Sequence, residues 1–167
     1  MTFTLRTQRL VLRSFCADDS LWVAETLENT DVAQWIPLLP YPYGIDDARA
    51  FVEMQSGSKA DALAVIHNGI PVGCITKATE LGYWFSKSAW GQGFATEAAR
   101  ADVAHHFKTA EHNMTSGYMM DNTRSQRVLS KLGFTPTETV KRLSTAMSEM
   151  RTIQRMELSR ANWEARR

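Results

Sequence analysis

The sequence predicts an α+β fold, in which a mixed central sheet of about six or seven strands is flanked by about four helices. Short apolar runs typical of strands fill the middle and the end of the chain. Residues 96–108 and 124–132 instead carry apolar side chains at helical spacing. The length of 167 residues suits a single domain over residues 1–167, with enough chain to bury a core.

The first part of the chain is expected to form a strand, two helices and an ordered loop. Residues 10–13 form an apolar strand, and residues 18–29 form a helix with acidic residues near its positive end. Three prolines interrupt residues 36–44, which predicts a loop. Asp46 is the expected cap of a helix that runs through Gln55.

An antiparallel meander is expected in the middle of the chain. The apolar runs 62–67 and 70–75 are joined by Asn68-Gly69, which is a strong hairpin signal. A third run, residues 81–85, follows closely and is expected to form the next strand.

In the second half, helices and strands alternate. Residues 96–108 form an alanine-rich helix, residues 115–120 a short strand, and residues 124–132 a second helix. Gly133 stands where a helix would be capped at its carboxyl end. Residues 151–158 form the last clear strand.

Composition excludes several classes of protein. Nineteen basic and 18 acidic residues give a net charge of +1, so the broad positive field of a nucleic-acid binder is absent. No apolar stretch is long enough to predict a membrane span or membrane partner. Cys16 and Cys74 suggest no disulfide framework, which favours a cytoplasmic protein. Both cysteines are expected to be buried apolar residues. No grouping of histidines and cysteines has metal-ligand spacing, so no metal is expected. A monomer and a homodimer both fit.

The most informative segment is residues 90–97, which read W-G-Q-G-F-A-T-E. Gly91 and Gly93 allow the backbone to turn with positive φ just before a helix begins. Free N–H groups at that helix end bind anions, and a diphosphate fits best. A dinucleotide fingerprint is disfavoured because Thr96 takes the place of its third glycine, and no P-loop motif is present. A glycine-rich turn without a ligand is the alternative.

At this loop the sequence resembles the GCN5-related N-acetyltransferase (GNAT) superfamily, and more narrowly its RimJ/RimL-type branch. The resemblance rests on residues 82–85 and 90–98, G-Y-W-F and W-G-Q-G-F-A-T-E-A. Residues 7–13, 122–134 and 158–163 match the branch's opening strand, its Asn, Ser, Lys and Gly-Phe motif, and its closing segment. These stretches span nearly the whole chain, in the family's order.

The resemblance implies a site for acetyl-CoA, the acetyl donor. The superfamily loop reads Q/R-x-x-G-x-G/A, and Trp90 stands in its first place here. The family's pattern assigns the pyrophosphate to the backbone N–H groups of Gln92, Gly93, Phe94, Ala95 and Thr96.

The same resemblance places the pantetheine arm of the donor in a V-shaped gap. One side of the gap is the strand of Tyr83, Trp84 and Phe85, whose backbone is expected to pair with the pantetheine amides. The other side is a parallel strand near residue 116, from which the first strand splays. Asn122 is expected to cap the following helix and to contact the pantetheine.

Two residues are the candidates for catalysis. Glu80 precedes the 82–85 motif, where the branch usually carries an acidic residue, and is the candidate base for the attacking amine; a solvated Glu is the alternative. Glu97 is explained by the helix dipole. Ser125 is the candidate proton donor to the sulfur, or the organiser of a water near it. Many members of the superfamily that the sequence resembles use a Tyr for this role, but this helix contains none, and the spacing of Ser125 to Val128 and Leu129 places it on the inward face. A serine bonded to its own helix is the alternative.

The predicted function is transfer of the acetyl group of acetyl-CoA to a primary amine by direct attack in a ternary complex. The favoured acceptor is a protein or peptide N-terminus, as for ribosomal proteins. A small amine such as a polyamine or antibiotic, and a non-catalytic acyl-CoA-binding module, are the alternatives. Residues 35–43 match the region where the family lines its acceptor pocket, and a hydrophobic cover over the core is the alternative. Arg124, Arg127 and Lys131 form a basic stripe that could meet the CoA phosphates, but a solvated face is the favoured explanation for at least two of them.

Overall fold

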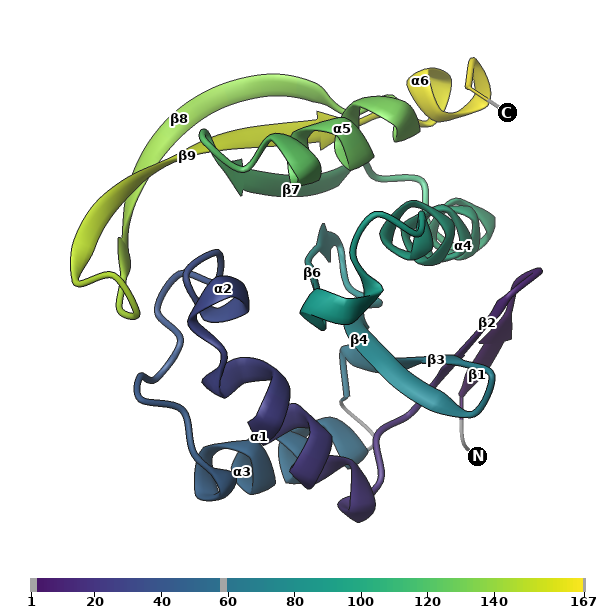
Figure 1. The fold of residues 1–167 in the computed structure, drawn as a ribbon. Helices are drawn as coiled ribbons and strands as arrows, with labels where there is room; N and C mark the ends of the chain where they lie inside the picture. The colour runs from purple at the N-terminus through teal and green to yellow at the C-terminus, as the bar shows by residue number, and fades with distance from the viewer. Residues whose placement is uncertain (1–2, 58–59, 167) are drawn as a thin grey trace.

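A computed structural model describes residues 3–57 and 60–166 of the chain and contains two sheets (Figure 1). The five-stranded sheet has the order β1-β2-β3-β4-β6, and the four-stranded sheet has the order β5-β7-β9-β8. The strands are β1 (Thr4–Arg6), β2 (Leu10–Arg13), β3 (Ala62–His67), β4 (Ile70–Thr76), β5 (Glu80–Leu81), β6 (Tyr83–Phe85), β7 (Met114–Met119), β8 (Thr135–Ser144) and β9 (Glu149–Leu158). The predicted α+β class is confirmed.

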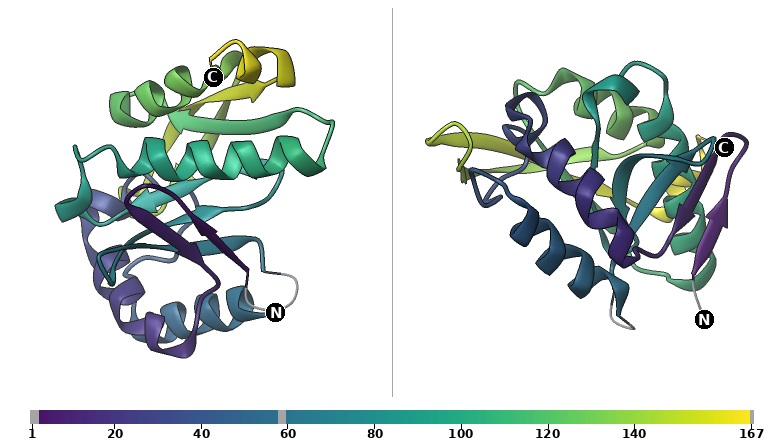
Figure 2. Two further views of the ribbon diagram at one scale, coloured as in Figure 1. Left: turned by 90° about the vertical axis from the view of Figure 1, so that its right-hand side faces the viewer. Right: turned by 60° about the horizontal axis from the view of Figure 1, so that its bottom comes forward.

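Helices cover both faces of the five-stranded sheet. In Figure 2, α4 runs across the molecule between β7 and the β1–β2 ribbon, while α1 and α3 lie side by side. The α-helices are α1 (Ser20–Glu28), α2 (Thr30–Ala33), α3 (Ile45–Ser56), α4 (Phe94–Thr109), α5 (Thr123–Leu132) and α6 (Arg160–Glu164), with short 3-10 helices η1 (Ala17–Asp19) and η2 (Lys87–Ala89). No helix in the described part of the chain has the length and apolar character needed to cross a bilayer.

The continuous apolar run of β3 is explained by burial on both faces of its sheet. Leu63 and Val65 pack in the cluster that contains α4, whereas Ala62, Ala64 and Ile66 pack in the cluster that contains α1 and α3. Successive side chains of a strand point to opposite faces, so a strand covered on both sides needs apolar residues throughout.

Local signals place several elements where the sequence predicts them. Asn68 and Gly69 have positive φ values of 50° and 80° and join β3 to β4 as the expected hairpin. Gly133 ends α5 with a φ of 95°, and an added Cβ there would lie 2.9 Å from the Asn162 carbonyl oxygen. The close approach of α6 therefore requires glycine at this helix end.

The expected strand over residues 81–85 is divided between the two sheets. Leu81 pairs in parallel with Ser116 of β7, whereas β6 pairs antiparallel with β4. The Ser116 hydroxyl donates to the Leu81 carbonyl at 2.8 Å. The Thr76 hydroxyl donates to the Glu80 carbonyl at 2.7 Å and accepts from the Gly82 N–H at 2.8 Å. The predicted splayed strands are thus present, and the division explains why two sheets replace one.

Three details of the first part of the chain differ from the prediction. The helix expected from residue 18 begins at Ser20, because η1 precedes it. Asp46 does not cap α3: Gly44 is the N-cap, and its N–H donates to the Asp47 carboxylate at 2.9 Å. Cys16 is exposed rather than buried.

Asp19 is buried because four donors surround its carboxylate. Arg13 donates through Nη1 at 2.7 Å and Nη2 at 2.9 Å, the Cys16 N–H donates at 2.8 Å, and Trp22 Nε1 donates at 2.7 Å. Burial alone would raise the pKa of Asp19, but these hydrogen bonds outweigh it and lower the pKa to about 2. The network fixes the turn from β2 into α1.

We expect Asp19→Asn to lower the free energy of unfolding by about 2 kcal/mol at pH 7, since the folded state favours the ionised carboxyl. The pKa of Asp19 is lower in the folded chain, so its contribution is full above the unfolded value of about 3.9 and is lost as the pH falls towards 2. Denaturant unfolding at pH 7 and at pH 2.5 measures the change. The exposed neighbour gives the control Asp18→Asn, and an Asp19→Asn loss of equal size at both pH values contradicts the assignment.

Candidate active site

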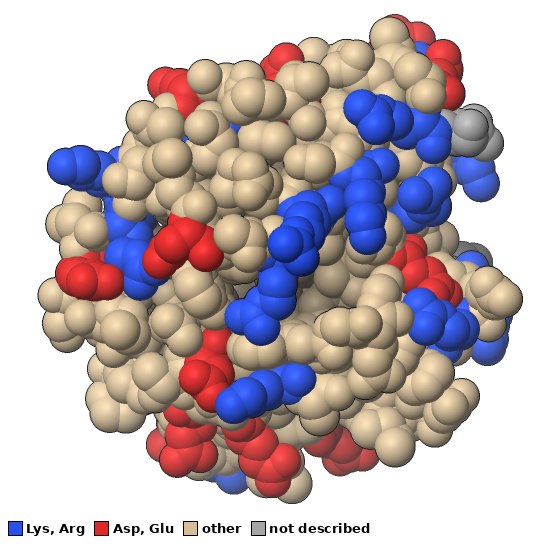
Figure 3. Space-filling model, turned by 45° about the horizontal axis from the view of Figure 1, so that its top comes forward, with Lys and Arg blue, Asp and Glu red and all other residues tan. Residues whose placement is uncertain are grey.

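A cavity of about 720 Å³ lies where the two sheets diverge. Its wall is formed mainly by β5, β6, the start of α4, the end of β7, one face of α5 and the loop after α2. In Figure 3, a row of Lys and Arg side chains runs along the edge of a hollow on this side of the molecule. The cavity therefore brings together segments from most of the chain.

One end of the cavity is a candidate anion site made of backbone N–H groups. Gly91 and Gly93 adopt the left-handed conformation, with φ values of 75° and 79°, and Gly93 is the N-cap of α4. The first helical bond joins the Glu97 N–H to the Gly93 carbonyl at 3.0 Å. Among residues 3–57 and 60–166, no acceptor pairs with the N–H groups of residues 91–96. Free amides at the positive end of a 16-residue helix suit a phosphate group.

Arg9 holds this loop in place from the other side. Its Nη1 donates to the Gln92 carbonyl at 3.0 Å, and its guanidinium lies 4.8 Å from the centre of the Phe94 ring. Glu97 accepts from Arg9 Nε at 2.7 Å and from the Thr7 hydroxyl at 2.6 Å. Burial acts to raise the pKa of Glu97, but the hydrogen bonds from Thr7 and Arg9 outweigh it and lower the pKa. Glu97 thus anchors the loop, which is a role beyond the predicted dipole effect.

The predicted pyrophosphate residues divide into two groups. Gly93, Phe94, Ala95 and Thr96 line the cavity. The ring of Phe94 is buried and lies 4.5 Å from the ring of His67, so this residue also fastens the loop to the core. Gln92 is exposed, and its side-chain amide donates to the Ser88 carbonyl at 2.8 Å. Its backbone N–H has no partner among residues 3–57 and 60–166 and is available to a ligand.

A basic wall faces the anion site. Arg124, Arg127 and Lys131 of α5 all line the cavity. The Arg124 guanidinium lies 3.7 Å from the centre of the Trp90 ring, and Trp90 Nε1 donates to the Phe85 carbonyl at 3.0 Å. The stripe predicted from the sequence thus faces the cavity, where its positive charge adds to the positive potential of the free amides of α4.

The strand β6 leaves part of its backbone free on the side of the gap. The Thr76 N–H donates to the Gly82 carbonyl, and the Ser86 N–H donates to the Val72 carbonyl. In an antiparallel ladder the residues that bond to the neighbouring strand alternate. The backbone N–H and C=O groups of Trp84 therefore also point towards β4, while those of Tyr83 and Phe85 point away from it. The Phe85 carbonyl is taken by the Trp90 indole. The main chain of Tyr83 is consequently the freest backbone of β6 for an extended ligand.

Asn122, Ser125 and Tyr83 meet at the middle of the cavity. Asn122 caps α5 as predicted, since its Oδ1 accepts from the Ser125 N–H at 3.2 Å. The Ser125 hydroxyl lies 2.9 Å from the hydroxyl of Tyr83. Burial raises the pKa of Tyr83 to about 12, against a smaller lowering by the hydrogen bond to Ser125. Sequence reasoning missed the Tyr83 hydroxyl, because it sought a tyrosine on the helix rather than on the facing strand.

A carboxylate lies at the start of β5, whereas Phe85 at the end of β6 contacts Trp90 beside the loop before α4, so the two lie at opposite ends of this strand. Glu80 lines the cavity with 59% of its side chain exposed and accepts from Arg155 Nη1 of β9 at 2.7 Å. Trp35, Ile36 and Pro37 line the same cavity. Glu80 and part of the predicted acceptor loop thus line the same cavity, and the structure adds a guanidinium partner of Glu80 that the sequence did not reveal.

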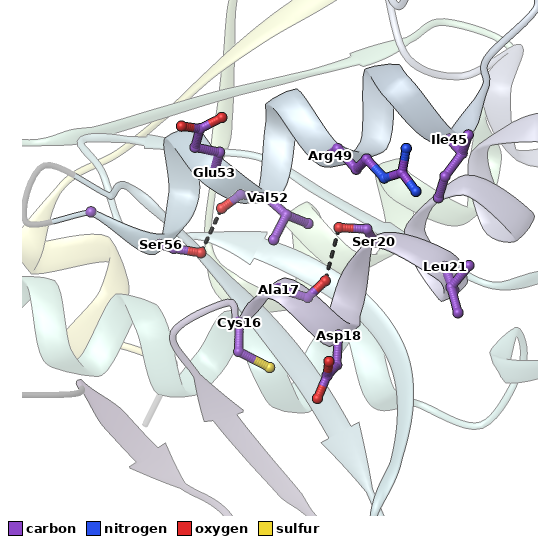
Figure 4. Close-up of a pocket in the computed structure, with 11 residues that line it drawn as sticks. Cys16, Ala17, Asp18, Ser20, Leu21, Ile45, Arg49, Val52, Glu53 and Ser56 are labelled. Carbon is purple, nitrogen blue, oxygen red and sulfur yellow. Dashed lines mark hydrogen bonds between the residues drawn. The ribbon is translucent and has the colours of Figure 1, made fainter.

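Neither cysteine is placed to act as a nucleophile. Burial raises the pKa of the Cys74 thiol far above its usual range. Cys16 lines a second, more open hollow of about 1030 Å³ between the start of α1 and α3 (Figure 4). There the hydroxyls of Ser20 and Ser56 donate to carbonyls of their own helical turns. Within the described part of the chain, no group of three or more His, Cys, Asp or Glu side chains could hold a metal ion.

Comparisons with known proteins agree on one family. The model of the acetyltransferase (GNAT) domain matches residues 9–135. The N-acetyltransferase YnaD of Bacillus subtilis (strain 168) is 29% identical over 139 residues, which cover 77% of this chain and 81% of YnaD.

Solved structures have the same fold. A GNAT-family acetyltransferase from Bacillus anthracis has a TM-score of 0.80 at 27% identity, covering 94% of this chain and 98% of that chain. The ribosomal-protein-S5-alanine acetyltransferase from Vibrio fischeri has a TM-score of 0.77 at 17% identity, covering 96% and 98%, and this likeness concerns the fold. Together with the free amides at α4 and the gap beside β6, the family match shows that the chain belongs to the GNAT acetyltransferases, which use acetyl-CoA.

Proposed function

We propose that the protein transfers the acetyl group of acetyl-CoA to a primary amine, most specifically the N-terminal amine of a protein or peptide, by direct attack in a ternary complex. One observation carries the proposal. A single cavity contains free helix-start amides at one end, the free main chain of Tyr83 in the middle and the Glu80 carboxylate at the other end. This order matches a diphosphate, an extended thioester arm and an approaching amine.

The residues of the cavity supply what acetyl transfer needs. The N–H groups of residues 92–96 and the basic wall bind the diphosphate, and Asn122 with the Tyr83 backbone aligns the arm. A backbone N–H on β6 stabilises the negative charge that develops on the thioester oxygen. Glu80 accepts the proton that the amine loses, directly or through water. A modest base is sufficient, because a peptide α-amine has a pKa of about 8.

Direct transfer is favoured over an acetylated enzyme. Cys74 lines the cavity, but its thiol is fully buried and held in the protonated form. Cys16 belongs to the other hollow. Neither thiol is suited to carry the acetyl group, so we infer that the acceptor amine attacks the thioester directly.

The acceptor class is supported by the resemblance of residues 122–134 to the RimJ/RimL-type motif and by the fold likeness to the Vibrio fischeri ribosomal-protein acetyltransferase. To test it, the protein is incubated with acetyl-CoA and a mixed library of peptides and small amines, and products are identified by mass spectrometry. Acetylated peptide N-termini are expected. If only polyamines or antibiotics are acetylated, the acceptor is a small amine and not a peptide N-terminus. If CoA binds but no amine is acetylated, the protein is a non-catalytic acyl-CoA-binding module.

Gly93→Ala is expected to weaken CoA binding about tenfold, because the added methyl group lies 3.4 Å from Arg9 Nη2 and displaces the guanidinium that aligns the loop amides. Gly69→Ala is the matched control. Gly69 has nearly the same φ, 80° against 79°, and open space around an added Cβ, so both variants carry similar backbone strain. Calorimetry measures the affinity, and an equal loss in both variants would contradict the assignment of the loop.

Glu80→Gln is expected to lower kcat/KM about tenfold at pH 7, where the acceptor amine is mostly protonated. The difference in kcat/KM between Glu80→Gln and the parent protein becomes smaller at pH 9, since the acceptor amine is then mostly deprotonated in solution. Glu53→Gln, at the separate hollow of Figure 4, serves as the control. A pH-independent loss in Glu80→Gln would assign Glu80 to acceptor binding rather than to proton removal.

A further inference from the structure

Two hydroxyl groups from distant parts of the chain meet on the wall of the cavity. Tyr83 Oη, from β6, lies 2.9 Å from Ser125 Oγ and 3.4 Å from the Ser125 carbonyl oxygen, in the first turn of α5. Both residues line the cavity. The role proposed for Tyr83 in pantetheine binding involves only its backbone. That role does not explain the contact made by its hydroxyl.

The Ser125 hydroxyl is not bonded to its own helix in the usual way. Helical Ser and Thr hydroxyls commonly donate to a carbonyl three or four residues earlier. Ser56 does so to Val52 at 2.6 Å, and Thr109 does so to His105 at 3.4 Å. Within residues 3–57 and 60–166, the partner of the Ser125 hydroxyl is Tyr83 alone. The hydroxyl is therefore held by the facing strand, and its hydrogen is not consumed by the helix.

The chemistry of the pair decides which hydroxyl donates. A phenol, with an ordinary pKa of about 10, is much more acidic than an aliphatic alcohol and is the better donor. The 2.9 Å contact to Ser125 Oγ is also much shorter than the 3.4 Å contact to the carbonyl oxygen. Tyr83 is accordingly the expected donor to Ser125 Oγ, although the contact allows either direction, and this choice leaves the hydrogen of Ser125 for a ligand in the cavity.

We propose that Tyr83 is a positioning residue for the transfer reaction, which directs the hydroxyl hydrogen of Ser125 at the sulfur of the thioester. This inference rests on the proposed function. As the bond from amine nitrogen to acetyl carbon forms, the bond from carbon to sulfur breaks and its electron pair passes to sulfur. Ser125 donates a hydrogen bond to that sulfur, the amine proton leaves through Glu80 or water, and the thiolate later takes a proton from water.

Tyr83 keeps its own proton throughout this sequence. Burial raises the pKa of Tyr83 to about 12, well above the value of about 8.5 for an ordinary thiol. Transfer of the phenolic proton towards the sulfur is therefore uphill, and the part of Tyr83 is limited to orientation of Ser125.

A double-mutant cycle of Tyr83→Phe and Ser125→Ala tests the inference. Each single variant is expected to lower kcat about tenfold, while KM for acetyl-CoA changes less than about twofold. Because Tyr83 acts through Ser125, the double variant is expected to lose no more than Ser125→Ala alone. Ser125→Thr, which restores a hydroxyl, is expected to recover activity when Tyr83 is present and not in the Tyr83→Phe background.

A second measurement does not depend on turnover. A hydrogen bond from Ser125 stabilises the thiolate of bound CoA, so ultraviolet titration of that thiol should give a pKa that rises by about 0.7 in Tyr83→Phe and in Ser125→Ala. Tyr43→Phe, a buried phenol outside the cavity, and Ser130→Ala, an exposed serine of α5, are matched controls. Thermal unfolding confirms that each variant is folded.

The outcomes separate this inference from the proposed function. Wild-type kcat in Tyr83→Phe, an unchanged thiol pKa, or losses that multiply to about a hundredfold in the double variant would overturn the role of Tyr83. Bound CoA with the shifted thiol pKa, but no turnover with any amine, would overturn the proposed function and retain the hydrogen-bonded pair. Absence of CoA binding would overturn both.

Discussion

The site depends on Gly82, where the strand changes its hydrogen-bonding neighbour from β7 to β4. Up to Leu81 the strand bonds to β7, and from Tyr83 onwards it bonds to β4. The hydroxyls of Thr76 and Ser116 satisfy the backbone groups at the junction, which would otherwise be left unpaired. Because the strand cannot follow both neighbours, the sheets part. Backbone groups that a continuous sheet would consume are then available to a ligand.

Charge is distributed along the cavity in a way that orients a long ligand. Positive potential comes from the start of α4 and from Arg124, Arg127 and Lys131, whereas the carboxylate of Glu80 lies towards the other end. Arg155 pairs with Glu80 at 2.7 Å and lines the same cavity, so the charge of this carboxylate is largely balanced. The strongest electrostatic feature is therefore the positive potential of α4 and α5, which favours a phosphate at that end of the cavity.

The sequence predicts the parts of the fold that depend on neighbouring residues. Asn68-Gly69 specifies the hairpin, the paired glycines specify the loop before α4, and Asn122 specifies the start of α5. Each signal acts within a few residues, through a positive φ or a cap. Even a local signal can be ambiguous. The sequence predicts Asp46 as the cap of α3, but the carboxylate that bonds to the Gly44 N–H belongs to the adjacent Asp47.

Contacts between distant segments could not be predicted in this way. Tyr83 and Ser125 are 42 residues apart, and Glu80 and Arg155 are 75 residues apart. Nothing local in either pair specifies the other member, since the meeting depends on where β6, α5 and β9 lie after folding. The family resemblance places Glu80 and Ser125 at the site, but the partners that modify their chemistry come only from the packed structure.

The contact between Arg9 and the α4 loop couples the two ends of the chain's first hundred residues. Arg9 bonds to the Gln92 carbonyl and to Glu97, so the alignment of the free amides at the start of α4 depends on the docking of the β1–β2 ribbon. Occupation of the loop must, by mass action, stabilise that ribbon as well. The amino-terminal ribbon and the donor site thus form one cooperative unit, and slower amide hydrogen exchange in β2 would report ligand bound elsewhere in the molecule.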